Sequence, residues 1–444
     1  MPQLVGRESE LTELRAAHTN AATTCTPRLL IISGAGGVGK SALADAFEES
    51  AAPQSLVMRA IAYPFDRLIP FSLWARLPNL VERVDRATRE QPALILIDDA
   101  HYADEESLEQ IGAMMRQLSN RPVLVVLIRD DEDDRALSIE TAATISLRRI
   151  DMQAARALAS KHFPDAASEV LDAIVANARG VPYEVVAIAS AAARRRSSEA
   201  DAVDRSSRIA IAKELASLPA DQRGALQMLS LFSEPIEAAL LGSPVPDSVY
   251  IRNDAGVVRF DHALTSAAIM ETIAMKIPLR RRIIGAIERR GLRTIRDRLA
   301  LAEQSLASGD GAFARATLLD LAFAANAEHL TRAVIWASER HLELGEPPDE
   351  RFGEFYTNFF QALMEAHAFA RAESVAALAL SEAQHRELPH LGALAAQLVQ
   401  AQWSVERHEA AKASYERYAS AFEDPHDLQV LRNAAPWLTR ASAG

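Results

Sequence analysis

Short apolar runs alternate with amphipathic segments through the first third of the chain. Four such runs are bounded by polar residues, at positions 29–32, 56–58, 94–97 and 123–128. Helical periodicity marks the intervening segments, most clearly at 40–49 and 105–118. Apolar runs of this length are typical of strands buried on both faces, with helices as the crossover connections. The pattern therefore predicts an α/β domain over residues 1–150, a parallel sheet with helices on both faces.

Helical periodicity takes over after residue 150. Residues 151–163 and 166–193 are rich in alanine and predict a small all-α bundle. The segment 194–207 is polar with little to bury, and we interpret it as a linker. From 209 to about 298 we expect helices and a short strand pair around 249–260.

The C-terminal third carries a repeat. The segments 330–333, 369–372 and 409–412 recur, and their residues Ala333, Ala372 and Ala411 are 39 residues apart. Each segment follows one helical pattern and opens a second. Helix pairs of this kind stack as tetratricopeptide-like repeats in an α-solenoid. The alternative is an ordinary helical bundle with an accidental period.

Composition and charge narrow the class of protein. The chain has 444 residues, a net charge of −12 and a single cysteine, Cys25, which excludes an internal disulfide. Charged residues among the first twenty positions exclude the apolar core of a signal peptide, and no apolar stretch reaches the roughly 20 residues of a membrane span. We therefore expect a cytoplasmic location and no membrane contact.

A dense group of arginines between positions 280 and 298 stands against this acidic background. Such a group can face the phosphates of DNA. No aromatic residues interleave with the arginines, however, and Glu288 and Asp297 interrupt them. We do not expect this chain to bind DNA without an added output domain.

A phosphate-binding loop follows the first apolar run directly. Its residues are Gly34, Ala35, Gly36, Gly37, Val38, Gly39, Lys40 and Ser41. Glycines allow backbone N–H groups to point inward at phosphate oxygens, Lys40 supplies a point charge to the β/γ-phosphates, and Ser41 offers a hydroxyl to Mg²⁺. The alternative is a glycine turn in an α/β domain. The motif predicts ATP/ADP and Mg²⁺ as cofactors.

Acidic and basic residues follow two later strands. Asp98 and Asp99 end the third apolar run, where Asp98 is expected to hold Mg²⁺ through water and Asp99 to polarise the attacking water. The alternative is an acidic turn that caps the helix at 105–118. Arg129 ends the fourth run, where it either senses a γ-phosphate or neutralises the acidic run 130–134.

Several segments in order resemble one family. They are Leu4-Val5-Gly6-Arg7-Glu8, Ile97-Asp98-Asp99-Ala100-His101-Tyr102-Ala103-Asp104 and Leu127-Ile128-Arg129-Asp130. This set resembles the signal-transduction ATPases with numerous domains (STAND), in the bacterial branch of large LuxR/MalT-type regulators, over roughly residues 1–300. The resemblance implies that Val5, Gly6 and Arg7 pack against adenine and that Pro182, in Gly180-Val181-Pro182, touches the base. It also implies that His262 reaches the β-phosphate of ADP; by residue type alone, His262 is a satisfied core histidine.

The resemblance completes the predicted fold class: an α/β P-loop NTPase followed by an all-α lid, a winged-helix-like domain and α-solenoid repeats. The expected domains are 1–150 for nucleotide binding, 151–207 for the lid and linker, 208–298 for the winged helix and 299–444 for the repeats. Two departures stand out. Lys40 and Asp98 are only 58 residues apart, short for this family, which predicts a missing helix or strand. No LuxR-type helix-turn-helix is found, so either the output domain was removed or the protein signals without one.

These observations lead to one leading hypothesis, an ATP/ADP-operated signalling switch that is the regulatory part of a LuxR-family regulator. It would hydrolyse ATP to ADP and phosphate slowly and self-associate in the ATP state, with an inducer ligand or protein partner on the helical repeats. A remodelling or loader ATPase of the AAA+ type is one alternative, which steady turnover would favour. A scaffold with a nucleotide that is never hydrolysed is the other.

Overall fold

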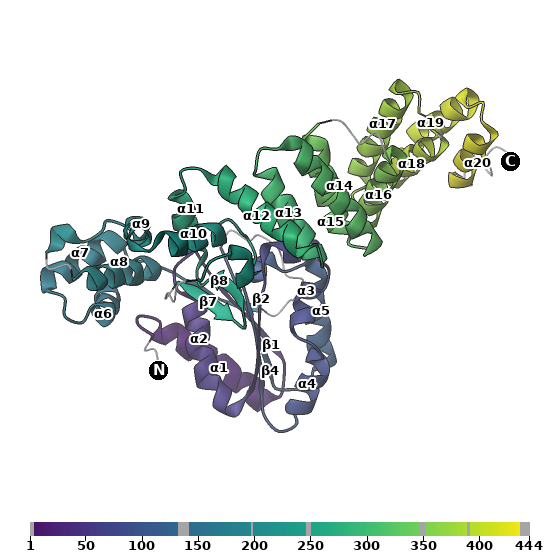
Figure 1. Ribbon diagram of the computed structural model, residues 1–444. Helices are drawn as coiled ribbons and strands as arrows, with labels where there is room; N and C mark the ends of the chain where they lie inside the picture. Colours follow the sequence, from purple (N-terminus) through teal and green to yellow (C-terminus); the bar gives the residue numbers. More distant parts are fainter. Residues whose placement is uncertain are drawn as a thin grey trace. The chain divides into compact units, whose positions relative to one another are not determined.

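The computed structural model describes residues 4–131, 142–196, 199–245, 250–345, 351–388 and 391–435. The chain divides into two compact units, Met1–Gly291 and Leu292–Gly444 (Figure 1). No helix in the described ranges is long and apolar enough to cross a membrane.

A five-stranded parallel sheet with the order β2-β3-β4-β1-β5 forms the centre of the first unit. Its strands are β1 (Arg28–Gly34), β2 (Leu56–Ile61), β3 (Ala93–Asp98), β4 (Val123–Arg129) and β5 (Ala142–Leu147). The four strands expected from apolar runs are confirmed. Strand β5 was not predicted, because Thr144 and Ser146 interrupt its apolar residues; it pairs with β1 on the side opposite β4.

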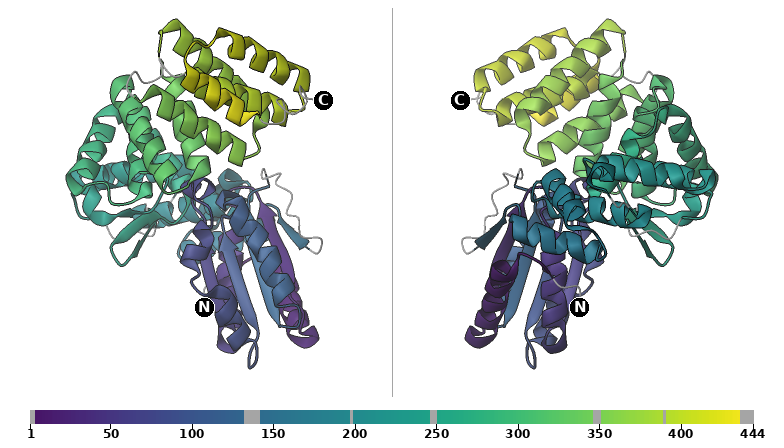
Figure 2. Two further views of the ribbon diagram at one scale, coloured as in Figure 1. Left: turned by 90° about the vertical axis from the view of Figure 1, so that its right-hand side faces the viewer. Right: turned by 90° about the vertical axis from the view of Figure 1, so that its left-hand side faces the viewer.

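Helices cover both faces of this sheet (Figure 2). Neighbouring side chains of a strand point to opposite faces, so each central strand contributes to two cores. Ile31 and Ile95 pack on the side of α5 (Glu105–Gln117), whereas Leu30 and Leu96 pack on the side of α1 (Glu8–Thr24) and α2 (Lys40–Ala51). Each of these side chains is at most 5% exposed, and burial of one contributes about 1.5–3 kcal/mol.

The chain between Lys40 and Asp98, which are 58 residues apart, forms several short elements, and the predicted loss of a helix or strand relative to the family stays a prediction. Helices α2, α3 (Ser72–Arg76) and α4 (Leu80–Ala87) and strand β2 all lie between these residues. The segment is short because α3 and α4 have only five and eight residues.

Three helices form the lid bundle: α6 (Met152–His162), α7 (Ser168–Ala178) and α8 (Pro182–Arg195). The predicted helical stretch 166–193 is interrupted before Pro182, which begins α8 at a position where a missing N–H has no effect.

The linker predicted at 194–207 packs against the bundle in its described part. Asp204 is buried, where it pairs with Arg195 and accepts a 2.6 Å hydrogen bond from Lys213 Nζ. Val203 enters the lid core. The polar composition did not indicate these contacts, because the buried charge of Asp204 is compensated by Arg195 of α8 and Lys213 of the next α-helix.

A winged-helix-like module completes the first unit. It comprises α9 (Ser207–Ser217), α10 (Ala220–Leu229), α11 (Ala263–Glu271), α12 (Lys276–Arg290) and the strands β6 (Ile236–Glu237), β7 (Ile251–Asp254) and β8 (Val257–Phe260). The strands form an antiparallel sheet with the order β6-β8-β7. The arginine-rich segment 280–298 is not one helix, because α12 ends at Arg290 and α13 (Ile295–Leu306) begins after a cap at Thr294.

The second unit consists of helices stacked in pairs. After α13 come α14 (Gly311–Ala327), α15 (Thr331–Glu343), α16 (Phe352–Glu365), α17 (Phe369–His385), α18 (Leu391–Ser404), α19 (His408–Ala421) and α20 (Pro425–Ala434). The three recurring segments lie at the starts of α15, α17 and α19, which confirms the period. Ala333, Ala372 and Ala411 occupy equivalent positions and are fully buried. Their small side chains allow the helices of each pair to approach closely.

Candidate functional site

The phosphate-binding loop connects β1 to α2 as the motif requires. Gly37 and Gly39 have φ values of 81° and 97°, which disfavour any residue with a Cβ. Gly39 directly precedes α2, so the first backbone N–H groups of that helix face the loop. The residues present therefore fit a phosphate chain, which would accept hydrogen bonds from these amides.

The ammonium group of Lys40 is held within the loop. Its Nζ donates to the carbonyl oxygens of Gly34 at 2.7 Å and Ala35 at 3.1 Å, and it pairs with Asp130 just after β4. Asp130 also lies 3.8 Å from His101 Nε2. A phosphate that binds here must compete with the Asp130 carboxylate for Lys40. Asp130 was predicted only as part of an acidic run, because the sequence does not show that its strand ends beside the loop.

Ser41 and Asp98 meet at the carboxyl ends of the strands. Ser41 Oγ donates to Asp98 Oδ1 at 3.3 Å, and Asp98 also accepts from the backbone N–H of Asp99. A hydroxyl beside a carboxylate is a set of hard oxygen donors that fits Mg²⁺. The two residues assigned to the metal are thus brought together.

Arg59 of β2 is a member of the site that sequence reasoning missed. Its Nη2 donates to Asp98 Oδ2 at 2.7 Å, and its Nη1 pairs with Asp45 and, at 3.0 Å, with Glu48 of α2. Burial opposes the charge of the guanidinium, but the hydrogen bond to Asp45 and the negative charges of Asp98 and Asp45 outweigh it and raise the pKa of Arg59. The carboxylate of Asp98 is therefore neutralised by an arginine.

Asp99 is a carboxyl group with a strongly altered proton affinity. Burial and then the like charges of Asp98 and Asp130 raise the pKa of Asp99 to about 7, against smaller opposite effects of Lys40 and Arg259. Its backbone is left-handed, with φ at 51°, at the sharp turn between β3 and the following short helix. A group that titrates near neutral pH is suited to accept a proton from water. Its predicted catalytic role stays a prediction.

Arg7 donates a hydrogen bond to the backbone of the phosphate loop. Arg7 is 5% exposed, and its Nη2 donates to the carbonyl oxygen of Val38 at 2.9 Å and to that of Arg148. Val5 packs against the lid core, and the Cα of Gly6 faces Ala154 of α6. The predicted adenine contacts of Val5, Gly6 and Arg7 therefore fall where the loop and the lid bundle meet.

The lid contacts the phosphate loop at the start of α8. The backbone N–H of Tyr183 donates to the carbonyl oxygen of Gly37 at 3.1 Å. A Cβ placed on Gly37 would lie 3.1 Å from side-chain atoms of both Tyr183 and Leu264, the latter on α11. The ring of Pro182 lies 3.9 Å from the corresponding position at Gly39. Lid and winged-helix-like module therefore converge on one glycine of the loop.

His262 lies at this junction. Its ring packs on that of Tyr183 with centroids 4.4 Å apart, and Tyr183 OH is 2.9 Å from Thr265 Oγ1. Nδ1 accepts from the N–H of Leu264 at 3.1 Å, so the proton of the neutral ring resides on Nε2. Burial lowers the pKa of His262, with a smaller contribution of the same sign from Lys40. A neutral Nε2–H donor is thus available beside the loop.

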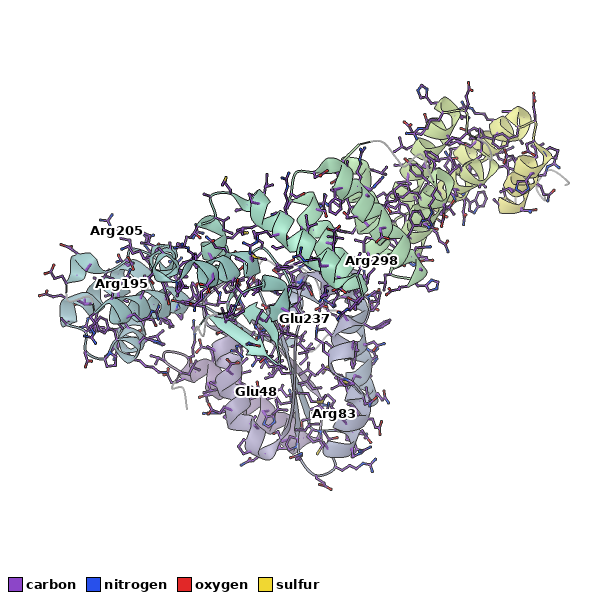
Figure 3. All side chains as sticks on the ribbon, viewed as in Figure 1. Glu48, Arg83, Arg195, Arg205, Glu237 and Arg298 are labelled. Carbon is purple, nitrogen blue, oxygen red and sulfur yellow. The ribbon has the colours of Figure 1, made fainter. Side chains whose placement is uncertain are left out.

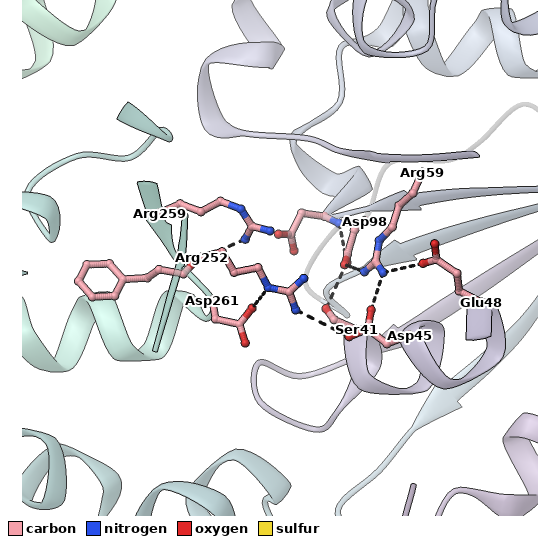
Figure 4. Close-up of polar contacts among 10 residues, drawn as sticks. Ser41, Asp45, Glu48, Arg59, Asp98, Arg252, Arg259 and Asp261 are labelled. Atoms are coloured by element: carbon pink, nitrogen blue, oxygen red, sulfur yellow. Dashed lines mark hydrogen bonds and ion pairs between the residues drawn. The ribbon is translucent and has the colours of Figure 1, made fainter. Parts of the chain in front are cut away.

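Two arginines of the β7–β8 hairpin lie near carboxylates of the nucleotide domain, Arg252 near Asp45 and Arg259 near Asp99 (Figure 4). Arg252 and Arg259 are directly opposite each other across the two strands. Arg252 pairs with Asp261 and lies 3.9 Å from Asp45 on α2. The charge of Arg259 lowers the proton affinity of Asp99. Neither arginine was predicted, since only the strand pairing places them together.

Arg129 ends β4, opposite Ser33 of β1 in the strand register. It therefore lies at the sheet edge where phosphate loop and acidic strand meet, and its sensing role stays a prediction. Of the acidic run 130–134, residues from 132 onward lie outside the described residues. The described residues contain no group of three or more His, Cys, Asp or Glu side chains able to hold a metal by themselves. A metal here would need oxygens from bound phosphates as well.

Comparison with known proteins gives partial matches. Residues 3–87 match a family model described as an AAA ATPase domain, which ends at the end of α4, before Asp98. No curated protein matches. A STAND protein with a tetratricopeptide repeat sensor from Pyrococcus horikoshii is 15% identical, over 99% of this chain and 75% of that one, with a TM-score of 0.47. Drosophila ORC bound to DNA is 14% identical, over 62% and 88%, with a TM-score of 0.35.

Proposed function

We propose that this chain is a nucleotide-operated switch of the STAND class. The observation that carries the proposal is the convergence of three modules on one phosphate loop. Tyr183 of the lid donates a hydrogen bond to Gly37, and Leu264 of the winged-helix-like module lies 3.1 Å from the position that a Cβ of Gly37 would take. A nucleotide bound in this loop would lie close to both modules, so its phosphates can favour one arrangement of the two modules over another.

ADP would stabilise the closed arrangement. The loop amides and Lys40 bind the phosphates, and the Nε2–H of His262 donates to the β-phosphate. Val5, Gly6 and Pro182 line the base. An additional γ-phosphate would approach the acidic edge formed by Asp98, Asp99 and Asp130, where its charge is unfavourable unless cations rearrange. ATP therefore favours an opened arrangement, in which we propose that the chain self-associates.

Hydrolysis would reset the switch slowly. Mg²⁺, held by Ser41 and Asp98, would stabilise the charges of the phosphates when bound. Asp99 accepts the proton of the attacking water, and Arg129 stabilises the negative charge on the transferred phosphoryl group. Arg59 and Asp130 compete for Asp98 and Lys40, so the reactive arrangement requires both pairs to be broken. This competition is the reason that we expect a low rate.

The repeats of the second unit would bind the inducer or protein partner that shifts the equilibrium. The ordered segments that resemble LuxR/MalT-type regulators support a role in transcription, with DNA contact made by an output domain. This part of the proposal rests on resemblance and not on the site.

The test is the nucleotide content and the mass of the purified chain. Denaturation should release ADP, and the monomer should assemble when ATP and Mg²⁺ are added, as measured by light scattering. Lys40→Ala protein should release no nucleotide and remain monomeric. Nucleotide-free monomer that is unchanged by ATP would refute the switch, and steady phosphate release without assembly would favour a remodelling ATPase.

A further inference from the structure

A notch in α12 lies apart from the nucleotide site. Gly285 and Ala286 lie in the middle of the helix, where their small side chains leave a cavity that both residues line. Met228 of α10 and Leu240 and Leu241 of the following short helix form an apolar floor. The resulting cavity has a volume of about 370 Å³, within the range of small-molecule sites.

Arginines surround this notch. Arg281, Gly285 and Arg289 follow one another at intervals of four residues, so they share one face of the helix. Arg282 lies beside them, and the guanidinium of Arg289 is 3.2 Å from the position that a Cβ of Gly285 would take. Along the helix axis, the backbone positions of Arg281 and Arg289 are thus about 12 Å apart, at 1.5 Å per residue.

Their positive charge is not compensated within the described residues. Arg281, Arg282 and Arg289 are exposed, and no described carboxylate pairs with them, whereas the neighbouring Arg290 pairs with Glu237 at 3.1 Å. Three like charges within two helical turns repel one another, in a chain whose net charge is −12. A concave apolar surface concentrates their field.

We propose that this notch binds a small anion with an apolar body, a carboxylate, sulfonate or phosphate attached to an aromatic or aliphatic group. The guanidinium groups of Arg281 and Arg289 bind the anionic group, since their paired N–H donors match its oxygens. The apolar body lies over Gly285 on the floor of Met228, Leu240 and Leu241. This inference is independent of the nucleotide switch.

The apolar floor argues for a small molecule and against nucleic acid. A DNA backbone is bound by cations spread over many phosphates, with no apolar floor between them. Here three cations surround one cavity, and its lining contains no aromatic side chain for base stacking. The chemistry of the lining therefore fits one anionic group with an attached hydrophobic part.

The probe is anilinonaphthalene sulfonate, an aromatic sulfonate that fluoresces in apolar surroundings, titrated into the full chain with saturating ADP. Saturable binding is expected, with at least tenfold weaker affinity in the double variant Arg281→Gln/Arg289→Gln. Gly285→Leu keeps every charge but fills the notch, and it should weaken binding to a similar extent. Arg83→Gln on α4 is the matched control (Figure 3). Arg83 is exposed and does not line the notch, so its loss should leave the affinity for the probe unchanged.

Thermal melting separates binding from folding, and the double variant should melt no earlier than the parent because it removes like-charge repulsion. Equal affinity in all variants would overturn the site. So would equal binding of the neutral analogue N-phenylnaphthylamine, which lacks the anion. Displacement of the probe by duplex DNA, with a steep salt dependence, would replace the small-molecule site by a surface for phosphate backbones.

Discussion

Replacing Arg59 tests whether its guanidinium competes with Mg²⁺ for the carboxylate of Asp98. Arg59→Gln keeps a polar side chain with N–H donors but removes the charge beside Asp98. Asp98 is 5% exposed, so its carboxylate would be left buried without its cation. The variant should therefore be less stable without metal, and it should bind Mg²⁺ more tightly because no cation has to be displaced.

The size of both effects follows from the geometry. Unit charges about 4 Å apart interact by about 4 kcal/mol at an effective dielectric constant of 20. The side chain of Arg59 is 21% exposed and is shared with Asp45 and Glu48, so we expect about half of this value, about 2 kcal/mol. That free energy corresponds to an affinity for Mg²⁺ about 30-fold higher in the variant.

The measurements are urea unfolding of the metal-free protein and calorimetric titration of Mg²⁺ into the ADP-bound protein. Arg83→Gln serves as the control for the loss of one positive charge, because Arg83 is exposed on α4 and is not among the residues that contact Asp98. If Arg59→Gln unfolds at the same urea concentration and binds Mg²⁺ no more tightly than the control, the arginine does not compete with the metal.

The remaining predictions concern four residues that bind or react. Lys40→Ala should abolish ATP binding, and an unchanged calorimetric affinity would refute the phosphate-loop assignment. Asp99→Asn should trap ATP and favour oligomers, so an unaltered hydrolysis rate would exclude Asp99 from the reaction. The pKa of Asp99 in the folded protein is raised to about 7, so ionisation of its carboxyl group opposes folding. As pH rises from about 4 to 7, the parent should therefore lose stability relative to Asp99→Asn. Parallel profiles of stability against pH for the two proteins would contradict the raised pKa. His262→Ala should accelerate ADP release about tenfold, the equivalent of one charge-assisted hydrogen bond, and equal stopped-flow rates would leave His262 a packing residue. Tyr183→Phe removes the hydroxyl that contacts Thr265, and it should accelerate ADP release less than His262→Ala does. An equal or larger acceleration in Tyr183→Phe would show that this hydrogen bond holds the lid.

Local patterns sufficed for the parts of the fold that are built locally. The strands preceding Gly34 and Asp98 were predicted because buried parallel strands are continuous apolar runs, and the repeat was predicted because equivalent helix starts need small residues such as Ala372. Ser41 and Asp98, both assigned to Mg²⁺ from the sequence, lie within hydrogen-bond distance because the loop after β1 and the end of β3 share one edge of a parallel sheet.

The parts that were missed depend on pairing between distant segments. Strand β5 contains Thr144 and Ser146 and is recognisable only through its register with β1. Arg59 lies in the middle of a strand, and its importance depends on β2 being the neighbour of β3. A signal was nevertheless present, because an arginine within an otherwise apolar strand needs a buried acid nearby.

The missed residues explain why the motif alone does not determine how the site works. Lys40 is paired with Asp130, Asp98 with Arg59, and Asp45 with both Arg59 and Arg252. Lys40 and Asp98, the charged residues assigned to phosphate and metal, thus each already have an internal partner of opposite charge. Binding of Mg²⁺ and phosphates must exchange these pairs for new ones, and Arg252 belongs to the winged-helix-like module. The exchange therefore changes the electrostatic attraction between that module and the nucleotide domain, which links the charge of the ligand to the arrangement of domains.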